Sequence, residues 1–281
     1  MLSKDDILRR KQMWDDVTVS IRKFFNDRGF VEFQTPLMVA SPGMEPNLDP
    51  FELKFRNPVS NKKFSKPGFE IFGLITSPEY SMKKLLGAGF EKIYTITPVF
   101  RNNELIGSYN IPQFTMLEWY GVGDYKDCMS DTEDLVNLVM GWEVDWPRIQ
   151  YQDAKVDSAG DPAVIKDYDR FFLTDYPAEQ ASLAKLSVDG KVAERFEAYV
   201  NGVELCNGFS ELTDPVEQRA RFEHEQEARR KLGKHVFPID IELLESLGKI
   251  EKPVYGNALG VDRLVMLKYG VEDIHDIQLL T

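Results

Sequence analysis

The chain has 281 residues, 43% of them hydrophobic and 12% aromatic, which is enough to bury a large core and suits one large domain or two small ones. Acidic residues outnumber basic ones by 46 to 34, and the net charge of -12 argues against general attraction to RNA or anionic lipid. The two cysteines form no CxxC pair and the three histidines are scattered, so the sequence indicates neither a disulfide framework nor a structural zinc site.

The amino-terminal segment is charged and lacks the apolar stretch of a signal peptide, and no apolar run approaches the length that crosses a membrane. We therefore expect a cytoplasmic protein without a membrane anchor. No repeat, low-complexity tract or convincing linker divides the chain, so residues 1–281 are expected to form a single domain.

The first element is predicted to be a helix that starts after Ser3. Ser3 and Asp6 have the spacing of a capping box, and large apolar residues recur at helical intervals as far as Phe25. Gly29 is expected to end this helix.

The next elements are predicted to be short. Residues 30–38 are interpreted as a strand broken by a proline, and residues 48–55 as a second strand. The stretch 57–68, rich in lysine, asparagine, proline and glycine, is a candidate flexible rim. Residues 76–89 are expected to form a helix whose first turn carries Glu79.

In the second half, Asn201 and Gly202 separate two alternating segments and are the strongest hairpin signal in the chain. The other expected elements are two strands around a polar loop within 100–120, a helix over 124–142, a polar connector over 143–176 with the loop signal DSAGDP, a mostly solvated helix over 214–233, and a strand or loop leading into a helix that ends near Gly270.

The stretch QFTMLEWY is predicted to be a strand with one unusual face. Alternation places four side chains together on that face: Phe114, Met116, Glu118 and Tyr120. An acid between large apolar groups is the notable feature of this strand, and a nucleotide site is one explanation for it. For this stretch taken alone, a surface ion pair between Glu118 and Arg101 is the simpler explanation.

The predicted hairpin brings a second group of polar side chains together. If residues 201–202 form a two-residue turn, four side chains share one face: Glu197, Tyr199, Glu204 and Cys206. Two carboxylates on a half-buried face repel each other unless a cation or proton lies between them, which favours Mg²⁺ carrying phosphates. The alternative is that Lys191 or Arg195 neutralises the acids, although Arg195 is assigned to the opposite face.

Arg263 supplies a third element, because it lies in the first turn of the last predicted helix, where free backbone amides favour an anion. Two arginines, a carboxylate pair and an acid-lined pocket together fit ATP activating a carboxylic acid, with a cationic amine recognised by the acids.

At this point the sequence resembles a known family. The stretches RGFVEFQTPLM, FRNNELIGSYNIPQFTMLEWY and NALGVDRLVML are similar to the three signature motifs of class II aminoacyl-tRNA synthetases, and FTMLEWY with ELCNGFSEL resembles the lysyl branch. The resemblance covers most of the chain. It is closer still to the lysyl-tRNA-synthetase-like ligases that attach (R)-β-lysine to elongation factor P, on the stretches VAERFEAYVNGVELCNGFSELTD and ALGVDRLVML.

The resemblance implies an α+β fold, with a mainly antiparallel sheet of six or more strands flanked by helices, and a homodimer built partly around the Pro36 segment. It implies that Arg101 holds the α-phosphate and the substrate carboxylate, and that Phe114 stacks on adenine opposite Arg263. Asn103 and Glu104 belong to the same ATP-binding motif.

By the same resemblance, Glu197 and Glu204 carry Mg²⁺. The residues implied to surround the lysine-like substrate are Glu79, Glu118, Tyr120, Asn207 and Glu211. Ala258 stands where lysyl-tRNA synthetases usually have glycine and the β-lysine ligases have alanine. Strict alternation places Asn207 and Glu211 on the face opposite Glu204, so a bulge or strand end at Gly208 is expected.

The expected function is formation of a lysine-type aminoacyl-adenylate, with (R)-β-lysine as the favoured substrate, followed by transfer to elongation factor P. A minimal synthetase that charges tRNA is one alternative, which the acidic balance and the lack of an anticodon-binding domain disfavour. An impaired paralogue that binds an amino acid or nucleotide is another. It is motivated by the second motif, which has Asn110-Ile111-Pro112-Gln113-Phe114 where relatives show His-Asn-Pro-Glu-Phe.

Overall fold

A computed structural model describes residues 2–57, 68–156 and 162–279. Its centre is an eight-stranded sheet in the order β1-β5-β6-β11-β10-β9-β8-β7. All neighbouring strands are antiparallel except the outermost pairs, β1 with β5 and β7 with β8. The bounds are β1 Val31–Glu32, β5 Ile93–Phe100, β6 Gln113–Val122, β11 Val254–Gly260, β10 Val203–Ser210, β9 Val192–Val200, β8 Arg170–Pro177 and β7 Arg148–Gln150. The expectation of an α+β fold with a large, mainly antiparallel sheet is confirmed.

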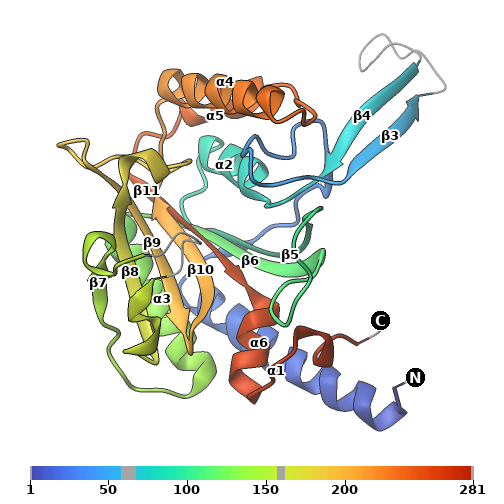
Figure 1. Cartoon of the computed structure of the whole chain (residues 1–281), viewed down its shortest axis with the longest axis vertical. Coiled ribbons are helices and arrows are strands. Elements are labelled where there is room, and N and C mark those ends of the chain that lie inside the picture. Colours follow the sequence, from blue (N-terminus) through green and yellow to red (C-terminus); the bar gives the residue numbers. More distant parts are fainter. Residues whose placement is uncertain (1, 58–67, 157–161, 280–281) are drawn as a thin grey trace.

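Six described helices flank the large sheet, and three of them, α1, α3 and α6, pack against one of its faces (Figure 1). Their bounds are α1 Lys4–Asp27, α2 Glu79–Gly87, α3 Tyr125–Met140, α4 Pro215–Lys231, α5 Ile241–Leu247 and α6 Val261–Tyr269. A smaller sheet in the order β2-β4-β3 projects from the body: β2 Met38–Val39, β4 Gly68–Leu74 and β3 Glu52–Asn57. Both ends of the described chain lie near α1 and α6.

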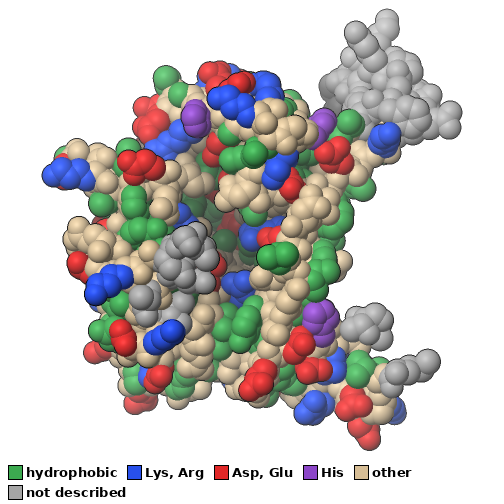
Figure 2. Space-filling view, in the orientation of Figure 1, with side chains coloured by type: hydrophobic (Ala, Val, Ile, Leu, Met, Phe, Trp, Pro, Cys, Tyr) green, Lys and Arg blue, Asp and Glu red, His purple; other side chains and the backbone are tan. Residues whose placement is uncertain are grey.

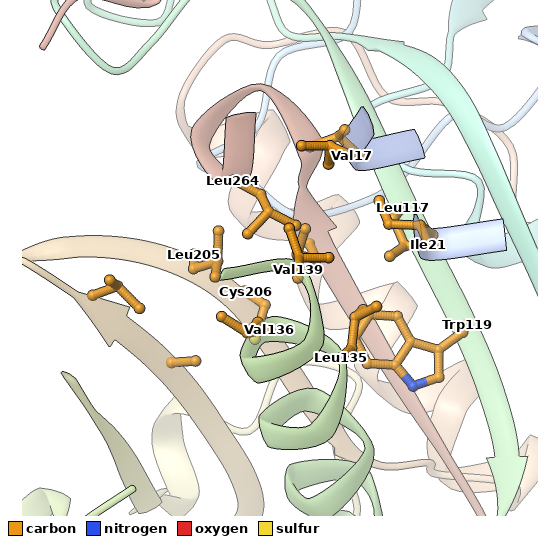
Figure 3. Packing of buried hydrophobic residues seen from close by; sticks show 14 of the residues in the cluster. Val17, Ile21, Leu117, Trp119, Leu135, Val136, Val139, Leu205, Cys206 and Leu264 are labelled. Carbon is orange, nitrogen blue, oxygen red and sulfur yellow. The ribbon is translucent and has the colours of Figure 1, made fainter. Parts of the chain in front are cut away.

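The main hydrophobic core lies between the large sheet and α1, α3 and α6. Figure 3 shows Val17 and Ile21 of α1 close to Leu117 and Trp119 of β6, with Leu264 of α6 nearby. These side chains are fully buried. Because alternate residues of β6 are buried in this core, the intervening residues of the same strand face the other side of the sheet.

Local signals predicted several elements correctly. Ser3 and Asp6 form the capping box of α1. Asn201 and Gly202 both have positive φ, at 49° and 79°, as the expected two-residue hairpin turn requires. Gly270 ends α6 in the left-handed conformation.

Other expectations need correction. The stretch 30–38 is not one broken strand, because its two ends pair in different sheets as β1 and β2. The connector 143–176 contains β7 and most of β8, so part of it extends the large sheet. The rim 58–67 and most of the DSAGDP loop lie outside the described residues. Among the described helices, none is long and apolar enough to span a lipid bilayer.

Candidate active site

A cavity of about 320 Å³ opens on the sheet face opposite the main core. Figure 2 shows it as a hollow near the middle of the molecule, with acidic and basic side chains around it. Its floor comes from alternate residues of three adjacent strands: Met116, Glu118 and Tyr120 of β6, Gly256, Ala258 and Gly260 of β11, and Asn207 and Phe209 of β10. The alternation predicted for QFTMLEWY is therefore confirmed.

Strand register places the central polar residues in one row. Ala258 pairs with Glu118 on one side and with Asn207 on the other, and Asn207 in turn pairs with Glu197. Neighbouring strands lie about 4.8 Å apart, so Glu118 and Asn207, which are two strands apart, are separated by roughly 10 Å. Ala258 is the small residue at the centre of this row.

One end of the cavity is rich in carboxylates around a single buried lysine. Lys83 of α2 contacts Glu79 Oε1 and Glu211 Oε2, each at 2.5 Å, and only 2% of the Lys83 side chain is exposed. The two carboxylates raise the pKa of Lys83 against the opposing effect of burial, so this lysine stays charged. Glu45 from the preceding loop also lines this end of the cavity.

Glu118 is held by two hydroxyl groups. Ser77 Oγ donates to Glu118 Oε2, and Tyr120 Oη donates to Glu118 Oε1, both at 2.6 Å. Burial and the nearby Glu79 raise the pKa of Glu118 to about 8, and burial raises that of Glu211 to about 8. Four carboxylates with one lysine leave this end short of positive charge, so it suits a ligand with ammonium groups.

A glycine of β11 permits this arrangement. A Cβ atom at Gly256 would lie 2.2 Å from Glu211 Oε1 and 2.5 Å from Tyr120 Cε1. Both side chains therefore pass directly over the backbone of β11, which only glycine allows.

The hairpin of β9 and β10 contains a bulge that was expected at a different place. Glu204 pairs with Tyr199 as predicted, but the register then shifts, and Cys206 pairs with Ala198 rather than with Glu197. The irregularity therefore lies between Glu204 and Cys206, not at Gly208. It turns Cys206 into the main core, where Figure 3 shows it, so the prediction that Cys206 shares the face of Glu204 is wrong. The same shift allows Asn207 to join that face.

The prediction that Arg195 lies on the face opposite Glu197 is also wrong, because both side chains lie on the same face. Its Nη2 atom contacts Glu197 Oε1 at 2.7 Å, and its Nε atom donates to Asn207 Oδ1 at 3.0 Å. Tyr199 Oη donates to the other oxygen of Glu197 at 2.8 Å. The alternative in which an arginine neutralises an acid of this pair thus holds for Glu197.

The opposite end of the cavity carries the two arginines. The guanidinium carbon of Arg101 lies 5.2 Å from the centre of the Phe114 ring, and Arg101 Nη1 lies 3.5 Å from Glu104 Oε1. Arg263 Nη2 donates to Asn110 Oδ1 at 2.7 Å. Asn110, one of the residues that departs from the family motif, thus contacts an arginine of the site.

A buried aspartate aligns the segments that bear these groups. Asp262, next to Arg263 at the start of α6, accepts from the backbone N–H of Thr115 at 2.6 Å and from Gln278 Nε2 at 2.9 Å. It thereby ties the first turn of α6 to β6 beside Phe114. Burial raises the pKa of Asp262 to about 6.

Glu204 is the carboxylate with room for a metal. Its side chain is 43% exposed and lies 3.7 Å from Arg263 Nη1. Its partial loss of water within the cavity, together with the nearby Glu197, raises its pKa. In the described ranges, no group of three or more histidine, cysteine or acidic side chains is arranged to hold a metal ion. Mg²⁺ bound to ATP phosphates needs only one or two protein carboxylates, which Glu204 fits, while both oxygens of Glu197 already have partners.

Most of the predicted site residues line this cavity. They are Glu79, Arg101, Glu104, Phe114, Glu118, Tyr120, Glu204, Asn207, Glu211, Ala258 and Arg263. Glu197, which pairs with Asn207, and the exposed Asn103, whose amide donates to Asp49 Oδ2 at 3.2 Å, are not among the lining residues. The sequence reasoning missed Lys83 and Glu45. The spacing of four residues between Glu79 and Lys83 on one helix was the available signal for the lysine.

Comparison with known proteins agrees with this geometry. The chain belongs to the class II tRNA synthetases of the D, K and N group, whose family profile matches residues 2–281. It is 37% identical, over an alignment 303 positions long, to the elongation factor P (R)-β-lysine ligase of Proteus mirabilis, and the alignment covers 93% of this chain and 91% of the relative. The ligases of the same name from Salmonella arizonae and Yersinia enterocolitica are each 36% identical, with the same coverage.

Proposed function

We propose that the chain is an ATP-dependent ligase that activates a lysine-type amino acid, (R)-β-lysine in particular, and transfers it to a lysine side chain of elongation factor P. The observation that carries this proposal is the polarity of the cavity, which has arginines at one end and an excess of carboxylates at the other. An amino acid with a carboxylate and two separated ammonium groups matches both ends. The names of the relatives supply the acceptor.

We assign the residues as follows. Arg101 binds the α-phosphate and the substrate carboxylate, and Phe114 and Arg263 hold the adenine between them. Glu104 contributes to the same nucleotide site, and Asn103 supports it from the rim. The ammonium groups of the substrate are assigned to Glu79, Glu118, Tyr120, Asn207 and Glu211, above Ala258.

The first chemical step joins the two ends of the cavity. A carboxylate oxygen of the amino acid attacks the α-phosphorus of ATP, the bond to the bridging oxygen breaks, and pyrophosphate leaves with that electron pair. Arg101 and Arg263 offset negative charge that develops on the phosphates. No side chain acts as a nucleophile, so orientation and electrostatics provide the catalysis.

In the second step an unprotonated lysine amine of the acceptor attacks the carbonyl carbon of the adenylate. An amide bond forms, AMP leaves, and the amine loses its proton. Mg²⁺, when bound, supplies charge neutralisation on the phosphates, and Glu204 is the residue assigned to hold it, with Glu197 behind it.

We further propose that residues 1–281 act as one catalytic domain and that two copies form a homodimer around the Pro36 segment. The same geometry is compatible with charging of tRNA, but the net charge of -12 gives no general attraction to RNA. An impaired binding protein is less well supported, because Asn110 occupies the altered motif and contacts Arg263.

Amino-acid-dependent exchange of pyrophosphate into ATP tests the first step. We expect exchange with (R)-β-lysine, and weaker exchange with L-α-lysine. Absence of exchange with either isomer, in a protein that still binds ATP, would favour the binding-protein alternative. Transfer of radiolabelled lysine to elongation factor P rather than to tRNA tests the acceptor, and labelling of tRNA alone would overturn the proposed acceptor.

A further inference from the structure

Arg229, near the carboxyl end of α4, is a buried cation outside the cavity lining. Only 2% of its side chain is exposed. Its Nε atom donates to the carbonyl of His235 at 2.8 Å, and its Nη1 atom donates to the carbonyls of Glu45 and Leu48 at 2.9 and 2.8 Å. Its Nη2 atom lies 3.6 Å from Asp49 Oδ1. One guanidinium therefore fixes both ends of the segment 45–49.

The segment 45–49 is part of the cavity wall, to which it contributes Glu45, Asn47 and Leu48. It forms no helix or strand that could hold it through a backbone ladder. Lys234 reinforces the anchor, because its Nζ atom donates to the carbonyl of Pro46 at 2.7 Å and lies 3.0 Å from Asp49 Oδ2. Two cations, Arg229 near the end of α4 and Lys234 just after it, thus hold the conformation of this wall.

Asp49 extends the connection to the nucleotide end of the cavity. The backbone N–H of Asn102 donates to the carbonyl of Asp49 at 2.7 Å, and Asn103 Nδ2 donates to Asp49 Oδ2 at 3.2 Å. Asn102 directly follows Arg101. Contacts therefore run from Arg229 through Asp49 to the loop that begins at an arginine of the site.

We propose that Arg229 and Asp49 are positioning residues that hold segment 45–49 and the loop after Arg101 in the arrangement that binds both substrates. The planar guanidinium suits this task because its three nitrogens, held in a fixed fork, reach carbonyl groups in different directions, whereas lysine donates all its hydrogens from one nitrogen. If this wall is ordered before the substrates bind, binding does not include the entropic cost of ordering it. This inference rests on the proposed function for its kinetic part only.

Three variants separate the steps. Arg229→Met removes the anchor, Arg229→Lys retains the charge without the fork, and Asp49→Asn weakens the link to the nucleotide loop. Lys268→Met serves as the control, because Lys268 Nζ donates to the carbonyl of Val139 between α6 and α3, away from segment 45–49. Amide hydrogen exchange and the KM values for ATP and the amino acid are measured below the melting temperature of each variant.

In Arg229→Met, we expect faster hydrogen exchange at residues 45–49 and 102–104, and a loss of about 100-fold in kcat/KM for both substrates. Arg229→Lys should recover part of that loss. Asp49→Asn should raise the KM for ATP about fivefold to tenfold and that for the amino acid less, since the contact with Asn103 and the ion pairs with Arg229 and Lys234 are weakened but the backbone anchors of the segment remain.

Unchanged hydrogen exchange at residues 45–49 in folded Arg229→Met protein would overturn the inference, whether or not the protein catalyses any reaction. A loss of kcat/KM no greater than that of Lys268→Met would also overturn it. A third outcome would contradict the proposed function alone. In it, the wild-type protein does not exchange pyrophosphate into ATP, but Arg229→Met still shows the expected faster amide hydrogen exchange.

Discussion

Lys83 and Glu211 form an ion pair inside the protein, with Lys83 Nζ 2.5 Å from Glu211 Oε2 and with 2% and 1% of their side chains exposed. Glu211 Oε1 is also buried and has no hydrogen-bond partner among the described residues. The lysine thus holds one oxygen of Glu211, while the other lies over the backbone of Gly256. A charge partner provided by the fold thus keeps in place a carboxylate that we assign to the substrate ammonium.

Replacement of this lysine should be costly. We expect Lys83→Met to lower the free energy of unfolding by about 3–5 kcal/mol at alkaline pH, because Glu79 and Glu211 are then buried without a cation. The loss should shrink as the pH falls, since the acids take up protons instead. Lys84→Met is the control, because Lys84 is 27% exposed beside Asp240 and Glu242. The free energy of unfolding of both variants is measured in urea. Equal losses in Lys83→Met and Lys84→Met would contradict this expectation.

Binding of the amino acid should strengthen with increasing pH. Glu118 has a pKa of about 8, against 4.5 for an ordinary glutamate, so the folded protein binds this proton more tightly than the unfolded chain does. Its contribution to stability is fully present below pH 4.5 and is lost as the pH rises to about 8. A ligand ammonium binds the ionised form of Glu118. The KM for the amino acid should therefore fall as the pH rises toward 8.

The measurement is the KM for the amino acid from about pH 6 to about pH 8.5, in the wild type and in Glu118→Gln. We expect the KM to change less with pH in Glu118→Gln than in the wild type, because the amide of the variant does not titrate. Glu91→Gln, which alters a surface pair with Lys252, should retain the wild-type slope. A Glu118→Gln profile as steep as that of the wild type would assign the titration to another group.

Gly256 should tolerate no side chain. In Gly256→Ala the new methyl group would meet Glu211 and Tyr120, so both must move, at a cost of about 1–3 kcal/mol and with weaker binding of the amino acid. Gly248→Ala is the matched control, since the nearest atom to its added methyl group, in Pro215, is 3.5 Å away. Thermal melts and amino-acid affinity are measured together. Wild-type affinity in Gly256→Ala would show that Glu211 does not contact the substrate.

Glu204→Gln tests the assigned metal role. We expect a sharp loss of adenylate formation and little change in melting temperature, because the amide keeps the shape of the side chain but not its charge. Glu32→Gln breaks the surface pair with Arg22 and should change stability by only a few tenths of a kcal/mol, with normal activity. Exchange of pyrophosphate is followed at several Mg²⁺ concentrations. Near-normal exchange in a folded Glu204→Gln protein would remove the metal role.

Ala258 should influence the choice between lysine isomers. It lies between Glu118 and Asn207 in the cross-strand row, and its methyl group packs near Met116. Moving the amine from the α to the β carbon shifts the ammonium relative to the carboxylate, and one methyl group is worth about 1–3 kcal/mol in discrimination. We expect Ala258→Gly to narrow the preference for (R)-β-lysine. Exchange kinetics with both isomers check this, and an unchanged ratio would mean that Ala258 has a packing role only.

Features decided by neighbouring residues could be predicted from the sequence. The capping box at Ser3, the turn at Asn201-Gly202 and the alternation that directs Glu118 and Tyr120 to one face all depend on a few adjacent residues. Family motifs added most of the remaining cavity residues, including Arg263.

Features decided by long-range pairing could not be predicted in this way. The bulge before Cys206 depends on how β10 meets β9 and β11, and a shift of one residue exchanges the two faces of a strand. The contacts of Lys83 with Glu211, and of Arg229 with Glu45, join residues 128 and 184 positions apart in the chain. Such partners become neighbours only when the chain has folded, so the sequence determined the side chains of the site, and the tertiary structure decided which charges balance one another.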